Sequence, residues 1–354
     1  MSLSAFLEHP VLQALGWTLL HSLWQGAALG LLAWVGLRLL RGRGPGPRYA
    51  LACAGLGLML ALPVATWWYL TDLEALRGAL RPALPWAVGF WLLGVAFMAL
   101  RLTGGWIWMQ RLRGRWAEPA SAHWQLRVGR LAQRMAVQRP IRLLKSLAVD
   151  APMVIGWLKP VILIPASCLA NMDPEALEAI LAHELAHIRR QDYLVNLLQS
   201  AVEALLFYHP AAWWLSRQIR LERENCCDDA AVAHCGDPVR YARALAGLED
   251  LRHSDPSYPT LALAANGGIL MNRIQRLILP KLPPSSGGRA GLLAILAVSA
   301  LGGTISKLLT GAELRPQGAT SLKKRRFHRR LFSFISFFIP VHHVHPRQTC
   351  AGYT

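Results

Sequence analysis

One short run of the sequence, His183-Glu184-Leu185-Ala186-His187, has the residue types and spacing to hold a metal ion and activate water. Histidines four positions apart share one face of a helix, so both imidazoles can bind a single Zn²⁺. Glu184 lies about 100° round the same helix, close enough to reach a zinc-bound water without binding the metal. Zinc lowers the pKa of that water towards ~7, and the glutamate takes its proton and passes it to a leaving amine. The pattern predicts one zinc ion per chain, with Glu184 as the general base of peptide hydrolysis.

A catalytic zinc needs a third protein ligand, and three glutamates downstream are candidates: Glu203, Glu222 and Glu224. Glu224 and Asp228 are four positions apart and share a helix face, whereas Glu222 points away from it. A glutamate on that face can bind the metal while Asp228 orients a ligand histidine, as carboxylates behind metal ligands do. The spacing therefore favours Glu224.

The competing candidate, Glu203, has a plainer interpretation. It forms a polar stripe with Asn196 and Gln199 on an otherwise apolar helix predicted over 193–207. Such a stripe is typical of the solvent-facing side of an amphipathic helix, which we favour over a ligand role. The aromatic run that follows, with Trp213-Trp214, is also compatible with a helix in the membrane interface.

Two further sets of residues near the motif are weighed in the same way. Cys226 and Cys227 are adjacent and do not easily clasp one tetrahedral metal, so they are predicted to be buried structural thiols. The group that stabilises the oxyanion stays open among three candidates: His234, Arg240 and Tyr241.

The elements around the motif indicate a compact α+β unit. Asp173 as N-cap and Pro174 at the first helical position predict a helix that runs through the motif to Arg190. Short β-like runs with intervening Pro and Gly predict a small sheet over 141–165. An amphipathic helix is expected over 123–137.

The composition indicates a membrane protein, because 53% of the 354 residues are hydrophobic and only 16% are charged. Four stretches without Asp, Glu, Lys or Arg are predicted membrane spans: 9–37, 49–71, 82–100 and 290–306. Arginines after the first and third spans place those ends in the cytoplasm, so residues 111–285 are expected to face it. The net charge of +18 is concentrated beside the spans and in the tail, which argues against nucleic-acid binding.

A polar cluster interrupts the first predicted span: His21, Ser22, Trp24 and Gln25. Polar groups within a span usually face other helices and hydrogen-bond across them. We therefore favour helix packing, with a proton or signal relay as the alternative.

Together these features resemble the BlaR/MecR-type antirepressor metallopeptidases. The resemblance covers roughly residues 11–306 and rests on order and spacing as well as on the motifs themselves: HSLWQG, PMVIGWLKPVILIP, HELAHIRRQDYLVN, FYHPAAWW and ERENCCDD. It implies that His183, His187 and Glu224 are zinc ligands, that Glu184 is the general base and that Asp228 supports the site. It also implies that Val161, Ile162 and Leu163 form the edge strand along which a substrate backbone pairs.

The resemblance implies a function as well. In that family a signal sensed outside the cell activates a cytoplasmic zinc protease, which then removes a DNA-binding repressor. The best-known members carry an external penicillin-binding sensor domain after the fourth span. This sequence lacks it, which argues against direct β-lactam sensing.

The expected molecule is an α-helical membrane protein of about four spans with a cytoplasmic α+β zincin-like metallopeptidase domain. Its parts are predicted as three spans in 1–110, the peptidase domain in 111–285, a fourth span in 286–310 and a basic tail in 311–354. The expected location is the bacterial inner membrane, and the expected partners are the lipid bilayer and a protein substrate, a repressor. A membrane quality-control zinc protease and a non-catalytic signalling scaffold are the alternatives. The sequence neither requires nor excludes a homodimer.

Overall fold

The computed structural model describes residues 9–70, 83–253 and 270–279. Three of its helices are long and apolar enough to cross a membrane: α2 (Pro10–Leu39), α3 (Pro45–Leu70) and α4 (Leu84–Arg115). They correspond to the first three predicted spans. The predicted fourth span, 290–306, and the basic tail lie outside the described residues.

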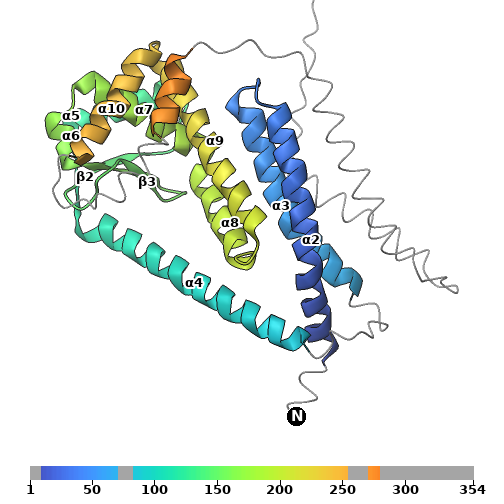
Figure 1. The fold of residues 1–354 in the computed structure, drawn as a ribbon. Coiled ribbons are helices and arrows are strands. Elements are labelled where there is room, and N and C mark those ends of the chain that lie inside the picture. The colour runs from blue at the N-terminus through green and yellow to red at the C-terminus, as the bar shows by residue number, and fades with distance from the viewer. Residues whose placement is uncertain (1–8, 71–82, 254–269, 280–354) are drawn as a thin grey trace, which may run out of the picture. The chain divides into compact units, whose positions relative to one another are not determined.

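The first two apolar helices pack side by side and are joined by a short turn at residues 40–44 (Figure 1). α4 is longer than predicted, because it continues past Leu100 to Arg115 and leads directly into the first strand. Its 32 residues extend about 48 Å, more than the ~30 Å of a hydrocarbon core. The arginine-bearing second half therefore reaches beyond the hydrocarbon, and the predicted boundary at 110/111 falls inside one continuous helix.

A four-stranded mixed sheet follows α4, with its strands in the spatial order β1 (Ala117–Pro119), β2 (Arg142–Ser146), β4 (Val161–Pro165) and β3 (Met153–Ile155). β4 is an interior strand, parallel to β2 and antiparallel to β3. Leu163, for example, pairs with Leu144 on one side and Met153 on the other.

The prediction that Val161, Ile162 and Leu163 form a substrate-binding edge is therefore wrong. Both sides of their backbone are occupied by neighbouring strands, so no hydrogen-bonding groups are left for a third strand. The continuous apolar run is better explained by a strand covered on both faces, since all five residues of β4 are buried. The edge on this side of the sheet is β3.

The main core lies between this sheet and five helices: α5 (Ala122–Arg134), α6 (Ala166–Asn171), α7 (Pro174–Arg190), α9 (Pro210–Cys235) and α10 (Pro238–His253). The predicted helix start at Pro174 is confirmed, because the Asp173 carboxylate accepts hydrogen bonds from the backbone N–H groups of Glu175 and Ala176 at 3.0 and 3.3 Å. α7 ends at Gln191, which adopts the left-handed conformation with φ 59°. The chain turns sharply there into the next helix.

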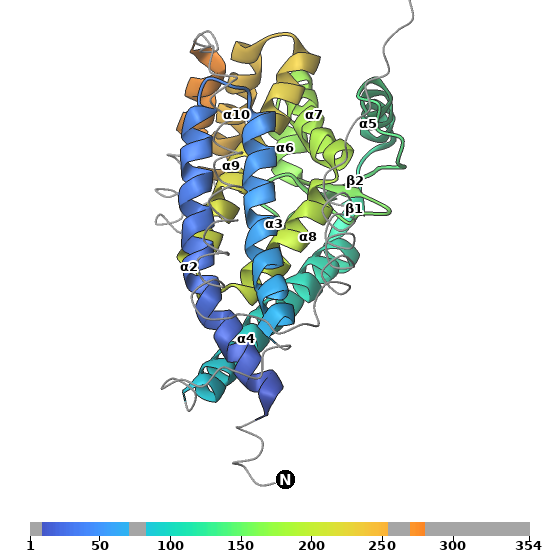
Figure 2. The ribbon, with the colours of Figure 1, turned by 90° about the vertical axis from the view of Figure 1, so that its right-hand side faces the viewer.

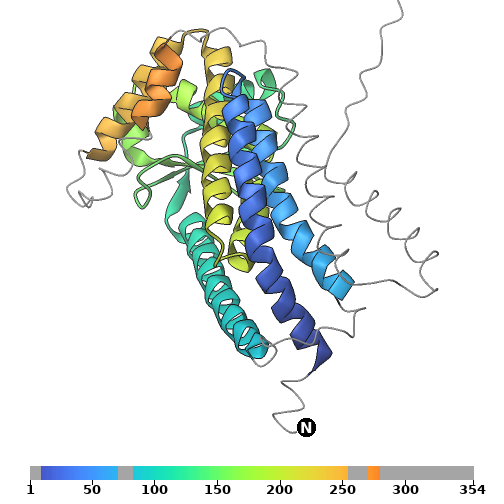
Figure 3. The same cartoon turned by 45° about the vertical axis from the view of Figure 1, so that its right-hand side comes forward.

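α8 (Asp192–Leu205) and α9 (Pro210–Cys235) form a helical hairpin that lies alongside α2 and α3 (Figures 2 and 3). The polar stripe of α8 faces α9, not solvent as expected. Gln199 donates to the carbonyl oxygen of Ser216 at 2.9 Å, and Glu203 pairs with Arg220. Because α8 presents its polar groups to α9, its outward side is left apolar.

Candidate metal centre

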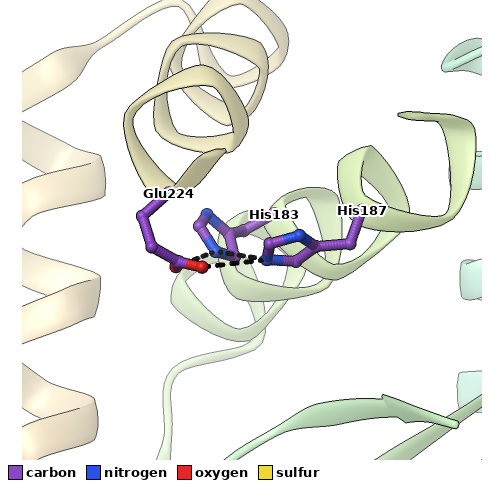
Figure 4. A group of neighbouring side chains, drawn as sticks. All are labelled: His183, His187 and Glu224. Carbon is purple, nitrogen blue, oxygen red and sulfur yellow. Dashed lines mark hydrogen bonds and ion pairs between the residues drawn. The ribbon is translucent and has the colours of Figure 1, made fainter. Parts of the chain in front are cut away.

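Two helices bring three donor side chains together. α7 carries His183 and His187 on one face, and α9 crosses that face and adds Glu224 (Figure 4). The two Nε2 atoms are 3.2 Å apart. The Glu224 carboxylate oxygens lie 3.3 Å from Nε2 of His183 and 3.8 Å from Nε2 of His187. The predicted trio therefore converges on one point.

These separations suit a tetrahedral zinc ion. Ligand nitrogens at about 2.0–2.1 Å from a tetrahedral zinc are about 3.3 Å from one another, close to the spacing of the two imidazoles. A carboxylate and two imidazoles are also the donor types that zinc takes in hydrolytic sites. The residues present therefore fit the metal that the sequence predicts.

The hydrogen bonds behind His183 direct its Nε2 atom towards that point. Tyr241 donates its hydroxyl proton to Asp228 Oδ1 at 2.8 Å, so its oxygen accepts from Nδ1 of His183 at 2.9 Å. Asp228 Oδ1 also lies 3.2 Å from the same Nδ1 atom. With the proton held at Nδ1, the lone pair of Nε2 is free to bind a cation. Asp228 therefore lies behind His183, one of the two predicted ligand histidines.

His187 is oriented in the same way by a carboxylate that sequence reasoning missed. Its Nδ1 atom donates to Asp192 Oδ2 at 2.8 Å, and Asp192 is nearly fully buried at the start of α8. The Cys227 thiol donates to the same carboxylate oxygen at 3.4 Å. Burial raises the pKa of this thiol, and the neighbouring Asp192 raises it further, so it stays protonated. Cys227 is thus a buried structural thiol, as the sequence predicts.

A second missed residue, Arg273, lies in the short helical segment 270–278. Its guanidinium donates to both carboxylate oxygens of Asp228, at 2.6 and 2.9 Å, and lies 3.7 Å from Glu224. A two-pronged arginine–carboxylate pair of this kind holds a fully buried aspartate ionised. Forty-five residues separate the partners, so no local pattern in the sequence could have paired them.

The charges of the site favour a bound cation. Burial alone would lower the pKa of His183, but its hydrogen bonds to Asp228 and Glu224 outweigh burial and raise that pKa to about 9. Burial alone would raise the pKa of Glu224, but the hydrogen bond and charge of His183 lower it to about 2. The carboxylates thus stay ionised and attract positive charge to Nε2 of His183, whether a proton or a metal ion.

Glu184 lies between the two histidines on α7, and its side chain is largely buried, with 8% exposed. Within the described part of the chain its carboxylate forms no hydrogen bond or ion pair. A buried carboxylate that follows His183 directly in the helix and has no competing partner there is available to handle a proton.

The other candidates from the sequence lie elsewhere. Glu222 pairs with Arg48 of α3 at 2.7 Å, and Glu203 contacts Ser216 and Arg220. Arg240 pairs with Glu175 at the surface. The buried Tyr241 hydroxyl bonds Nδ1 of His183, on the side of the ring opposite Nε2, so it does not face the point where the three donors converge.

Comparison with known proteins gives a consistent result. A family profile described as BlaR1 peptidase M56 matches residues 83–277. The regulatory protein BlaR1 of Bacillus licheniformis is 25% identical over 100 residues, which are 28% of this chain and 16% of that protein. The methicillin resistance mecR1 protein of Staphylococcus aureus strain Mu50 is 28% identical over 99 residues, which are 27% of this chain and 17% of that protein. The match thus spans about a sixth of the length of these curated relatives. Because the family profile covers more than half of the residues, the chain belongs to the BlaR1 peptidase M56 family.

Proposed function

We propose that this chain is a membrane-anchored zinc endopeptidase in which His183, His187 and Glu224 hold the metal and Glu184 is the general base. The convergence of three donors from two helices carries the proposal. A structural zinc usually has four protein ligands, whereas this cluster offers three and leaves a position for water or substrate. That count favours catalysis over a scaffold with a structural zinc.

The chemistry divides between the metal and the chain. A zinc ion at these donors would lower the pKa of a bound water and polarise the substrate carbonyl. Glu184 would accept the proton of the attacking water at its carboxylate and return it to the nitrogen of the leaving amine. Asp228, Tyr241 and Asp192 would keep both imidazoles in the tautomer that presents Nε2.

We further propose that the substrate is a cytoplasmic transcriptional repressor and that the peptidase faces the cytoplasm of a bacterial cell. The family membership, the arginines after the first apolar helix and those in the second half of α4 support this. A substrate strand would pair with β3, the edge strand on the side of the sheet that contacts α7.

The test compares cells that express the native chain with cells that express Glu184→Gln, by mapping newly formed protein N-termini. Glu178→Gln is the matched control, because it makes the same change on the same helix at a residue that pairs with Arg127 outside the site. We expect new termini with the native chain and the control, and none with Glu184→Gln.

The identity of the cleaved proteins distinguishes the remaining functions. Termini confined to a repressor support the proposal, whereas termini across many membrane proteins favour a quality-control protease. Identical termini from the native chain and Glu184→Gln, with zinc bound in both, would contradict peptidase activity.

A further inference from the structure

The α8–α9 hairpin is held between two of the membrane-spanning helices by its tip. The Trp91 indole of α4 donates to the carbonyl oxygen of Leu205 at 2.9 Å. On the other side, the Tyr208 hydroxyl bonds Ser22 of α2 at 2.6 Å, and Nε2 of His209 donates to the carbonyl oxygen of Leu23 at 3.0 Å. Two sequence motifs, HSLWQG and FYHPAAWW, thus contact each other.

The partners of the tip lie near the middle of the apolar stretches of their helices. Ser22 and Leu23 are close to the midpoint of the apolar segment Val11–Leu39, and Trp91 is the midpoint of the uncharged run 82–100. Glycines leave room for the tip at the same level, since a Cβ atom on Gly26 would meet the His209 ring and one on Gly94 would meet Phe207. If the helices cross a bilayer, the tip lies near its middle.

The outward side of the hairpin suits that depth. Leu197 and Leu198 of α8 are 58% and 53% exposed, and the exposed side chains from 197 to 205 include no charge. The one acidic side chain of this stretch, Glu203, is turned towards Arg220. Acyl chains can cover such a surface without leaving a polar group unpaired.

The middle of α9 and the end of α7 meet the beginning of α3. Glu222 of α9 pairs with Arg48 at 2.7 Å, and the Arg190 guanidinium at the end of α7 lies 4.8 Å from the ring centre of Tyr49. Arginine and tyrosine at the end of a span are typical of the boundary between hydrocarbon and headgroups. Both helices that hold the metal donors therefore touch the span at its surface end.

The length of α9 gives the distance of the metal centre from the middle of the bilayer, where the tip lies. Thirteen residues separate Ala211 at the tip from Glu224, which is about 20 Å at about 1.5 Å per residue. Half of a hydrocarbon core is about 15 Å, and the headgroup layer adds about 5–8 Å. For an α9 axis along the membrane normal, this length places Glu224 in the headgroup layer.

We propose that the metal centre works at the level of the lipid headgroups and cuts peptide segments held against the membrane surface. This rests on the proposed peptidase function and deepens it: a soluble protein becomes a substrate only after it docks on the bilayer. An extended substrate segment is only about 5 Å wide. A segment that lies between the metal donors and β3 is therefore also within reach of the lipid headgroups.

The first measurement tests the depth without using activity. The full chain is reconstituted in phosphatidylethanolamine–phosphatidylglycerol vesicles with benzoylphenylalanine in place of Ala201 on α8 or of Val239 on α10, and lipid adducts are counted after illumination. Val239 is the control, because α9 ends more than 20 residues beyond the tip and α10 follows it. We expect at least tenfold more adduct at position 201. Similar adduct at both positions would overturn the proposal.

The second measurement tests substrate presentation. A segment found to be cleaved by the native chain is placed behind a membrane anchor on a rigid helical spacer of 5 or of 40 residues, which differ by about 50 Å in height at about 1.5 Å per residue. Both carriers are confined to the same vesicle, so their comparison isolates height from local concentration.

We expect the short spacer to be cleaved at least tenfold faster than the long one. Equal rates, or faster cleavage on the long spacer, would overturn the headgroup-level proposal and leave the peptidase standing. Cleavage of neither carrier beyond the Glu184→Gln background would instead contradict the proposed peptidase function, and the lipid adducts would still decide the height of the site.

Discussion

Replacing Asp192 by Asn should weaken zinc binding, although Asp192 is not itself one of the proposed ligands. The carboxylate receives the Nδ1 proton of His187 at 2.8 Å and is nearly fully buried. A hydrogen bond to a charged partner contributes about 1.5–3 kcal/mol, against about 0.5–1.5 for a neutral one. The amide keeps the shape and one acceptor but loses the charge, so the expected loss is about 1–1.5 kcal/mol, or roughly five- to tenfold in the zinc dissociation constant.

Complete removal of the Asp192 carboxylate should cause the largest loss of zinc affinity among these variants. Asp192→Ala leaves Nδ1 of His187 without its acceptor, and the loss of such a supporting group typically costs 10–100-fold in metal affinity. Asp229→Asn is the matched control, because Asp229 is a partly exposed aspartate on α9 that pairs with Arg276 at 2.8 Å. Its zinc affinity should stay within about twofold of the native value.

The assay is competition for zinc between the full chain in detergent and a chromogenic chelator, with the melting temperature recorded to exclude unfolding. The ordering native, Asp192→Asn, Asp192→Ala should appear in the dissociation constants. Native affinity in a folded Asp192→Ala variant would refute the reasoning, because it would mean that His187 needs no support or does not bind the metal.

Two further predictions concern stability. Gly94→Ala should lower the free energy of unfolding by about 1–3 kcal/mol, since its Cβ atom would press on Phe207. Gly89→Ala on the same helix is the control: its Cβ atom meets nothing within 4 Å, so the change should be neutral or stabilising by up to about 1 kcal/mol. Equal melting temperatures of the two variants in detergent would contradict this prediction. Removing zinc with a chelator should lower the melting temperature of the chain, because zinc at 100 times its dissociation constant stabilises the folded state by about 2.7 kcal/mol. If the chelator strips zinc from a loaded chain and the melting temperature does not change, the proposed zinc site is contradicted.

Features with local causes could be predicted from the sequence. The start of α7 follows from the Asp173 cap and Pro174, and the apolar helices follow from long runs without charge. Glu224 could be selected because four-residue spacing places it on one helix face with Asp228. In each case the deciding interaction lies within one or two helical turns.

Features that depend on partners far apart in the chain could not be predicted from the sequence. Arg273 reaches Asp228 across 45 residues, and nothing in its own neighbourhood marks it. Asp192 becomes the partner of His187 only because Gln191 turns the chain through a left-handed conformation. The family resemblance implies an edge position for Val161, Ile162 and Leu163, and the sequence cannot correct it, because an apolar strand looks alike at an edge and in the interior. Only the pairing with β2 and β3 shows which it is.

The hairpin changes how the peptidase half of the chain should be handled. A fragment that begins at residue 111 would lack α2 and α3, which contribute Ala33, Ala52, Leu56 and Met59 to the apolar cluster around the hairpin. It would also remove Arg48, the ion-pair partner of Glu222 on α9. Since Glu222 is two residues from Glu224, that loss would fall on the helix that carries the third proposed metal ligand. Zinc affinity and hydrolysis therefore need to be measured on the full chain in detergent or vesicles, where the helices that hold the site together are present.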